Sequence, residues 1–151
     1  MITLQKSTKG ADSITWLNDC SVIYNFDSFT IHTDLKERLQ LEIDNFNNEI
    51  NYPQMWDIID CKKRLDNNQI LFLKFNDEYP GELIAWLWLD SVNGRIYNIY
   101  VNKNHRRKNV AFTLCEYARK IALSLKLQYT WVEVDKWNTP SIELHKKLGY
   151  E

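Results

Sequence analysis

The sequence predicts an α/β fold with a mixed sheet: helices come first, a run of antiparallel strands follows, and a β-α-β-α unit ends the chain. Three patterns predict this order. Apolar residues recur at helical spacing after residue 34. Three segments rich in β-forming residues follow between residues 70 and 101, separated by turn signals. Beyond residue 110, two helical patterns flank one further strand pattern. We therefore expect a central, mostly antiparallel sheet.

Length and composition indicate the class of protein. The 151 residues are 44% hydrophobic and 13% aromatic, which predicts a single domain over residues 1–151 with a packed core. The net charge of -1 gives no general attraction to nucleic acid or anionic lipid. Residues 1–6 contain no apolar signal region, and no stretch is long enough to cross a membrane. We expect a soluble, cytoplasmic protein without a membrane partner.

The three cysteines are widely spaced and form no Cys-x-x-Cys pair. An odd number of scattered cysteines fits a reducing compartment and argues against a zinc site or a disulfide framework. Cys115 falls within an apolar helical stretch, so we interpret it as a core residue. We expect no metal.

Charge is unevenly distributed along the chain. Acidic residues concentrate between residues 34 and 60, and basic residues between residues 103 and 126. One interpretation is that both groups form solvated surfaces. The other is that a basic pocket for a phosphorylated cofactor faces an acidic mouth for a cationic amine.

The first third of the chain predicts a hairpin and two helices. Residues 13–17 and 21–26 contain β-forming residues and could pair around a turn at residues 18–20. An apolar stripe from Leu35 to Ile50 predicts a helix, with Thr33 or Asp34 as its N-cap. Pro53 ends this helix. The spacing of Met55, Ile58, Ile59 and Leu65 predicts a second helix, which ends at Asn67-Asn68.

Three strands are predicted next, over residues 70–75, 81–89 and 95–101. The second of them is apolar on both faces, which is typical of a strand in the middle of a covered sheet. Trp86 and Trp88 share one face of this strand, and we interpret them as core residues in preference to ligand-stacking residues. The turn at residues 90–94 connects it to the third strand.

A basic loop then joins the third strand directly to a helix. The helix has an apolar stripe from Val110 to Leu125, a strand follows over residues 128–134, and Thr139-Pro140 begins the last helix. A strand-loop-helix junction of this kind points several backbone N–H groups and the positive end of a helix at one place. The sequence therefore predicts a site for an anionic group such as a pyrophosphate at this junction.

Two motifs in the second half of the chain resemble those of the GNAT superfamily of N-acetyltransferases. Residues 106–111, Arg-Arg-Lys-Asn-Val-Ala, resemble the acyl-CoA-binding pattern Arg/Gln-x-x-Gly-x-Gly/Ala, which also follows an apolar strand. Residues 138–150 resemble the second family pattern, an Asn followed by an apolar helix that ends in Tyr-x-x-x-Gly-Phe. The resemblance covers about the C-terminal half of the chain. It implies a GNAT-like fold in which the β-α-β-α half is splayed around acyl-CoA.

The resemblance also implies roles for individual residues. The strand before the basic loop would pair with the pantetheine arm, and one of its N–H groups would stabilise the oxyanion that develops during acyl transfer. The loop and the first turn of the helix would bind the diphosphate. Asn138 would hydrogen-bond the cofactor arm, although it is equally well explained as a plain residue at a helix N-terminus. The cofactor-binding residues implied in this way are Ile99, Tyr100, Val101, Arg106, Arg107, Lys108, Asn109, Val110, Ala111 and Asn138.

The sequence departs from the family pattern at two positions. Asn109 stands where the family has the glycine that lets the backbone approach the diphosphate, and Asn is among the residues that best tolerate unusual backbone angles. His145 stands where the family has the Tyr that protonates the departing thiolate. Free imidazole titrates near pH 6.5, so we expect activity to decline above neutrality if His145 is the acid. The alternative is a surface histidine without a role.

The sequence specifies less clearly which residue is the general base and which segment closes one side of the site. Glu133 is our candidate base, and Asp135 or Glu82 could also serve through a chain of water molecules. The chain ends at Glu151, where the family continues into a final pair of strands. Three outcomes are open: N-terminal strands fill their place, a partner subunit does, or the site stays open.

The leading hypothesis is an N-acyltransferase that moves an acetyl group from acetyl-CoA, its acyl-donor substrate, to a primary amine of a small molecule or peptide. Direct attack in a ternary complex is expected, because the motif region holds no cysteine that could form an acyl-enzyme. The alternative is a non-catalytic GNAT-like module that binds CoA or a protein partner. Nucleic-acid binding through residues 103–108 is the least favoured reading, and a homodimer is left open.

Overall fold

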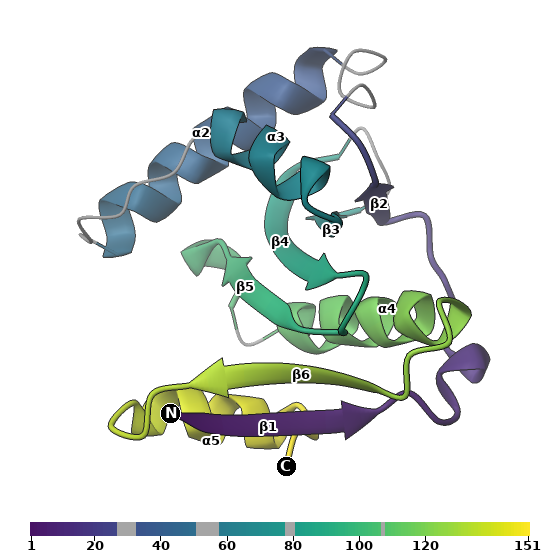
Figure 1. Ribbon diagram of the computed structural model, residues 1–151. Coiled ribbons are helices and arrows are strands. Elements are labelled where there is room, and N and C mark those ends of the chain that lie inside the picture. The colour runs from purple at the N-terminus through teal and green to yellow at the C-terminus, as the bar shows by residue number, and fades with distance from the viewer. Residues whose placement is uncertain (27–32, 51–57, 78–80, 107) are drawn as a thin grey trace.

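Two sheets that part at one end form the framework of the protein (Figure 1). The computed structural model describes residues 1–26, 33–50, 58–77, 81–106 and 108–151. One sheet has the antiparallel order β2-β3-β4-β5, formed by Cys20–Ile23, Gln69–Phe75, Leu83–Asp90 and Ile96–Val101. The other pairs β1 (Ile2–Ser7) with β6 (Tyr129–Val134). The helices are α2 (Thr33–Ile50), α3 (Ile58–Asp66), α4 (Val110–Ser124) and α5 (Thr139–Lys147), with short 3-10 turns η1 (Ala11–Ser13) and η2 (Lys103–His105).

Strand β4 lies between β3 and β5 and is covered on both faces, as its sequence predicts. Leu87 and Leu89 belong to a core cluster with residues of α4. Trp86 and Trp88 belong to a second cluster with residues of α2 and α3, and neither side chain is exposed. The interpretation of both tryptophans as core residues is therefore confirmed, and the predicted mixed α/β fold with an antiparallel sheet is confirmed as well.

The helices cover the sheets as the apolar stripes predict. Leu39 and Ile43 of α2 are fully buried, whereas Leu41 on the opposite side is exposed. Helix α3 ends at Asp66, and Asn68 takes a left-handed backbone conformation with φ 65°. The predicted roles of Pro53 and Met55 fall outside the described residues. None of the helices in the described ranges combines the length and apolarity that crossing a membrane requires.

The predicted hairpin of residues 13–17 and 21–26 is wrong. Residues 14–17 form no strand, because they are used instead to pack against α4. Trp16 lies on the ring of Tyr117 with 4.5 Å between ring centroids, and the Leu17 N–H donates to the Tyr117 hydroxyl. Strand β2 pairs with β3, from which it is separated by α2 and α3 in the sequence.

The N-terminal residues, for which the sequence predicts no strand, form β1 next to β6. Their antiparallel register places Ile2 opposite Val134 and Gln5 opposite Trp131. On its other edge, Gln5 exchanges two backbone hydrogen bonds of 2.9 and 3.0 Å with Glu151. Of the three outcomes left open for this region, the structure therefore has the first: an N-terminal strand lies beside β6.

Candidate functional site

Strands β5 and β6 meet at Gly94 and then separate. The Trp131 N–H donates a 3.1 Å hydrogen bond to the Gly94 carbonyl, and Arg95 and Trp131 form an isolated parallel bridge. Gly94 has φ +81°, and a Cβ at this position would lie 2.3 Å from the Tyr129 carbonyl oxygen. Only glycine fits such an approach. Because the two strands belong to different sheets beyond this point, an opening forms between them.

A β-bulge bends β5 shortly after the meeting point. Ile96 pairs with Leu89 and Ile99 pairs with Leu87, so Tyr97 and Asn98 together lie opposite Trp88 alone. An extra residue in one strand interrupts the ladder and increases the local twist. The bulge therefore bends β5 near the point where the two sheets part.

A cavity of about 780 Å³ occupies the opening. It lies between β5 and β6, reaches the N-terminal end of α4 and is bordered by α5. Its volume falls in the range of sites for small ligands and cofactors. The predicted site residues that line it are Ile99, Tyr100, Val101, Arg106, Asn109, Val110, Ala111, Glu133 and His145.

The α4 N-terminus has the backbone geometry of an anion site. Asn109, the N-cap residue, is left-handed with φ 60° and ψ 20°, as expected for an Asn at the family's glycine position. Its side chain does not cap the helix, and its carbonyl accepts hydrogen bonds from the backbone and the hydroxyl of Thr113. The first N–H groups of a helix have no partner within the helix, and they point toward the positive end of the helix dipole.

Arg106 is held by protein groups on the side of α2. Its guanidinium forms an ion pair with Glu49, and its Nε donates a 3.0 Å hydrogen bond to the Val101 carbonyl. Glu49 also accepts a 2.9 Å hydrogen bond from the Tyr100 hydroxyl. Burial opposes ionisation of Glu49, but the hydrogen bonds from Arg106 and Tyr100 outweigh it and lower the pKa of this carboxyl. Burial, and then Glu49 itself, raise the pKa of Tyr100 above its ordinary value.

His145 lies on α5 and faces the cavity with one side of its ring. Its Nδ1 is 2.7 Å from the Ser141 carbonyl, which can only accept a hydrogen bond, so Nδ1 carries a hydrogen. The Nε2 atom is then the ring nitrogen left for a ligand. The ring also meets the Tyr150 ring edge-on, with 6.3 Å between centroids.

Glu133 lies on β6 and is ion-paired across the opening. Its Oε2 is 3.1 Å from a terminal nitrogen of Arg95, the residue that precedes β5. The Arg95 guanidinium in turn lies 4.4 Å from the Tyr97 ring centroid and 5.3 Å from that of Trp131. A neighbouring cation therefore engages Glu133 beside the cavity.

Comparison with protein families identifies the group to which this architecture belongs. The acetyltransferase (GNAT) family matches residues 35–150. The chain belongs to the GNAT family. No curated protein sequence matches it significantly.

Solved GNAT structures share the fold at low sequence identity. A ribosomal-protein-alanine N-acetyltransferase from Brucella melitensis biovar Abortus 2308 is 14% identical with a TM-score of 0.64, over 85% of this chain and 89% of its own. An aminoglycoside acetyltransferase from an uncultured soil metagenomic sample, in complex with trehalose, is 16% identical with a TM-score of 0.61, over 87% and 88%. The aminoglycoside N-acetyltransferase AAC(6')-Iy, in complex with a CoA-containing bisubstrate analogue, is 21% identical with a TM-score of 0.56, over 75% and 85%.

The remaining residues predicted from the GNAT motifs lie at the margin of the cavity or outside the described residues. Lys108 is exposed and does not line the cavity. Asn138 is the N-cap of α5, where its Oδ1 accepts a hydrogen bond from the Ser141 N–H, so the helix-terminus alternative describes its structural position. Its contact with a cofactor stays a prediction. Arg107 falls outside the described part of the chain.

Several residues that line the cavity are not among the site residues predicted from the sequence. Phe112 of α4 and Leu144 of α5 border it and are 42% and 48% exposed. A signal for them was available, because both are large apolar residues off the buried stripe of an amphipathic helix. Glu49 had no such signal, since its partner Arg106 lies 57 residues away in the sequence. The other cavity residues outside the predicted set are Ile96, Tyr97, Asn98, His105, Val132, Val134, Ser141, Lys147 and Leu148.

Proposed function

We propose that this GNAT protein is an N-acetyltransferase that moves an acetyl group from acetyl-CoA to a primary amine of a small molecule or peptide. One observation carries the proposal: the cavity between β5 and β6 ends at the N-terminus of α4, where Asn109, at the position of the family's glycine, has a left-handed backbone conformation. The 151 residues would act as one domain in the cytoplasm. A homodimer is compatible with this function and is not required by it.

The chain offers two kinds of group to acetyl-CoA. The N–H groups of Val110 and Ala111, at the positive end of α4, are suited to the diphosphate, with Arg107 and Lys108 adding charge from the loop. The backbone of Ile99 to Val101 borders the opening and is suited to pair with the peptide-like pantetheine arm. Asn138 would support that arm from the other side of the opening.

The chemistry that these residues would perform is direct attack of the amine on the thioester carbonyl carbon. A β5 N–H would stabilise the negative charge that develops on the carbonyl oxygen, a contribution of about two to three orders of magnitude in other enzymes. The new C–N bond forms as the C–S bond breaks, and protonated His145 would donate its Nε2 hydrogen to the departing thiolate. Glu133 would take the proton of the attacking amine, directly or through water.

The charge of the chain favours a cationic acceptor. Glu49 and the buried Glu42 lie on α2, and Glu42 accepts a hydrogen bond from Asn102 at the end of β5. By the family resemblance α2 would lie on the acceptor side, where carboxylates attract an ammonium group before it is deprotonated. The structural neighbours act on aminoglycosides or on an alanine of a ribosomal protein, so both polyamine-like sugars and peptide amines are the acceptors to screen first.

The first experiment is a calorimetric titration of the protein with acetyl-CoA, followed by a screen for amine-dependent release of free CoA thiol. Micromolar binding that Arg107→Ala weakens, together with thiol release by at least one amine, would support the proposal. Absence of any binding would contradict it.

A second candidate function is a non-catalytic GNAT module that binds CoA or a protein partner. It is favoured by Asn109 and His145 in place of the family's glycine and tyrosine, and by the ion pair that engages Glu133. Binding of acetyl-CoA without thiol release for any amine of the screen would identify this function.

A further inference from the structure

Lys6 is a charged residue on the core-facing side of β1. Side chains alternate between the two faces of a strand, and Ile2 and Leu4, which share the face of Lys6, pack into the core cluster that contains α4. Only 18% of the Lys6 side chain is exposed. An ammonium group in such a position must find partners, because burying an unpaired charge is costly.

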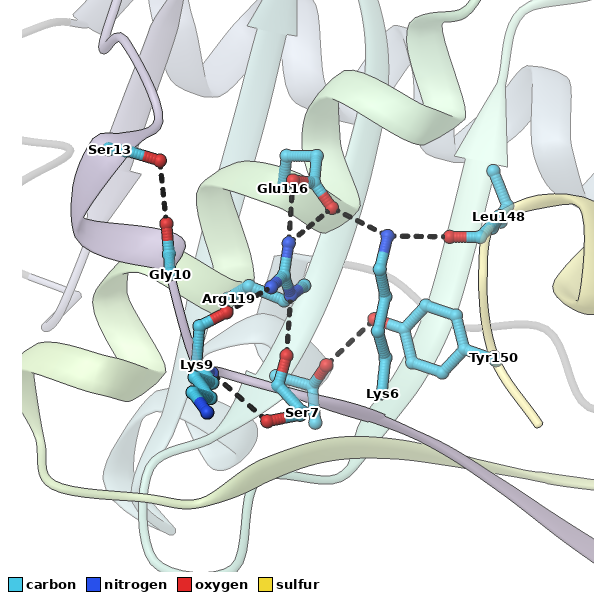
Figure 2. Close-up of polar contacts among 10 residues, drawn as sticks. Lys6, Ser7, Lys9, Gly10, Ser13, Glu116, Arg119, Leu148 and Tyr150 are labelled. Atoms are coloured by element: carbon cyan, nitrogen blue, oxygen red, sulfur yellow. Dashed lines mark hydrogen bonds and ion pairs between the residues drawn. The ribbon is translucent and has the colours of Figure 1, made fainter.

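The partners of Lys6 lie on both helices that border the cavity (Figure 2). Lys6 Nζ is 2.8 Å from Glu116 Oε1 on α4, and it donates a 2.8 Å hydrogen bond to the carbonyl of Leu148, the C-cap residue of α5. It also lies 5.1 Å from the ring centroid of Phe112, in the first turn of α4. One side chain of the N-terminal strand therefore links α4 to α5.

The end of α5 that Lys6 holds is the segment that fixes His145. The Gly149 N–H donates to the Lys146 carbonyl and the Tyr150 N–H donates to the His145 carbonyl, which together form a Schellman motif. Gly149 has φ +95°, and a Cβ on it would lie 2.9 Å from Lys6 Cε and Nζ. Lys6 thus packs directly on the turn whose first residue is His145 and whose last residue, Tyr150, contacts the His145 ring.

Lys6 is not needed to neutralise Glu116. Arg119 binds both oxygens of Glu116 at 2.6 and 2.8 Å, and its Nε donates to the Ser7 carbonyl (Figure 2). Replacing Lys6 by an apolar residue of similar length therefore leaves no carboxylate without a partner. Removing one partner of a buried ion pair is strongly destabilising when the other charge is left unpaired, and Arg119 prevents that here.

We propose that Lys6 is a positioning residue for the acetyl transfer: by linking β1 to α4 and to the C-terminal turn of α5, it holds His145 at the cavity. This inference rests on the proposed function. It makes the N-terminal strand part of the catalytic unit, although β1 itself is not among the segments that line the cavity. A shift of about 1 Å in a catalytic group can cost on the order of a hundredfold in rate, so a small displacement of α5 suffices.

The test compares Lys6→Met with Lys120→Met. Lys120 also links α4 to the N-terminal segment, through the carbonyls of Asp12 and Ile14, but neither partner belongs to α5. We expect Lys6→Met to lower kcat by about 10- to 100-fold with the Kd for acetyl-CoA changed by less than about threefold. Lys120→Met should leave kcat unchanged, and Lys6→Arg should retain most of it.

Imidazole ¹⁵N NMR provides a readout that does not depend on turnover. The chain has three histidines, so subtraction of the His145→Gln spectrum assigns the His145 signals. Lys6→Met should shift these signals or change their pH profile, and Lys120→Met should not. Unchanged His145 signals in folded Lys6→Met would overturn the inference, as would an unchanged kcat. Absence of acetyl-CoA binding in the unmodified protein would instead contradict the proposed function, with the NMR comparison still valid.

Discussion

The Arg106 guanidinium is ion-paired with Glu49 of α2, on the opposite side of β5 from α4. Arg106 also donates to the Val101 carbonyl, so two of its nitrogens have protein partners. The first arginine of the motif therefore connects the loop before α4 to the end of β5 and to α2. This arrangement indicates that Arg106 shapes the loop, and we expect the charge for a bound diphosphate to come from the other basic residues of the loop.

Arg106→Gln and Lys108→Gln should accordingly weaken acetyl-CoA binding in different ways. Loss of Arg106 disturbs the loop, so the affinity should fall with little change in its dependence on salt. Loss of the exposed Lys108 removes a charge that salt can screen, so the difference between low-salt and high-salt affinity should shrink. Calorimetry at two salt concentrations measures both effects. If Arg106→Gln reduces the salt dependence of the affinity as much as Lys108→Gln does, Arg106 binds the diphosphate directly.

His145 leads to a prediction about turnover. A general acid gives a proton to the leaving group in the transition state, which is worth about 10²- to 10⁴-fold in rate. We therefore expect His145→Gln to lower kcat by about 10²- to 10⁴-fold. His145→Tyr keeps a group that can donate a proton and should retain more activity than His145→Gln. An unchanged kcat in His145→Gln would exclude His145 as the acid.

Gly94 leads to a prediction about stability at the point where β5 and β6 meet. Gly94→Ala would place a Cβ 2.3 Å from the Tyr129 carbonyl oxygen in a residue with φ +81°. Gly10 is a matched control, because it has the same φ of +81° and no atom within 4 Å of the added Cβ. Gly10→Ala should cost about 1 kcal/mol of unfolding free energy, from backbone strain alone. Gly94→Ala should cost about 3 kcal/mol or more. Urea unfolding of both variants measures the difference in unfolding free energy. Equal losses of unfolding free energy would show that β6 moves away from the added Cβ at little cost.

Glu116 leads to a prediction about stability in acid. Burial raises the pKa of this carboxyl, but the hydrogen bonds and charges of Lys6 and Arg119 outweigh burial, and the pKa is lowered overall. A pKa lower in the folded than in the unfolded state contributes stability above the unfolded value of about 4.3 and loses it as the pH falls through the folded value.

Glu116→Gln should therefore be less stable than the unmodified protein at pH 7. The difference should shrink as the pH falls from about 4.3 through the lowered pKa of folded Glu116, because both proteins are uncharged at this position once that pKa is passed. Urea midpoints at several pH values test this, with Glu143→Gln on the exposed side of α5 as the control. A difference that is independent of pH would indicate a loss of packing and not of charge.

Most elements could be predicted from the sequence because their signals are local. The apolar stripes of α2, α3 and α4, the doubly apolar β4 and the Thr139-Pro140 start of α5 each depend on residues within one segment. Asn109 is a further case, since its left-handed conformation follows from its own side chain and its place in the motif. Such patterns need no knowledge of which segments meet.

The sequence by itself determined the family and the order of helices and strands from α2 to α5, since both are read from short-range spacing. Only the tertiary structure decided that β1 pairs with β6, that Lys6 links α4 to α5, and that Arg106 is paired with Glu49. These contacts join residues 57 to 142 positions apart, and no local pattern indicates which residue each partner meets. The physical reason is that a polar side chain acquires its role from the charges that the folded chain places beside it, which requires the whole fold.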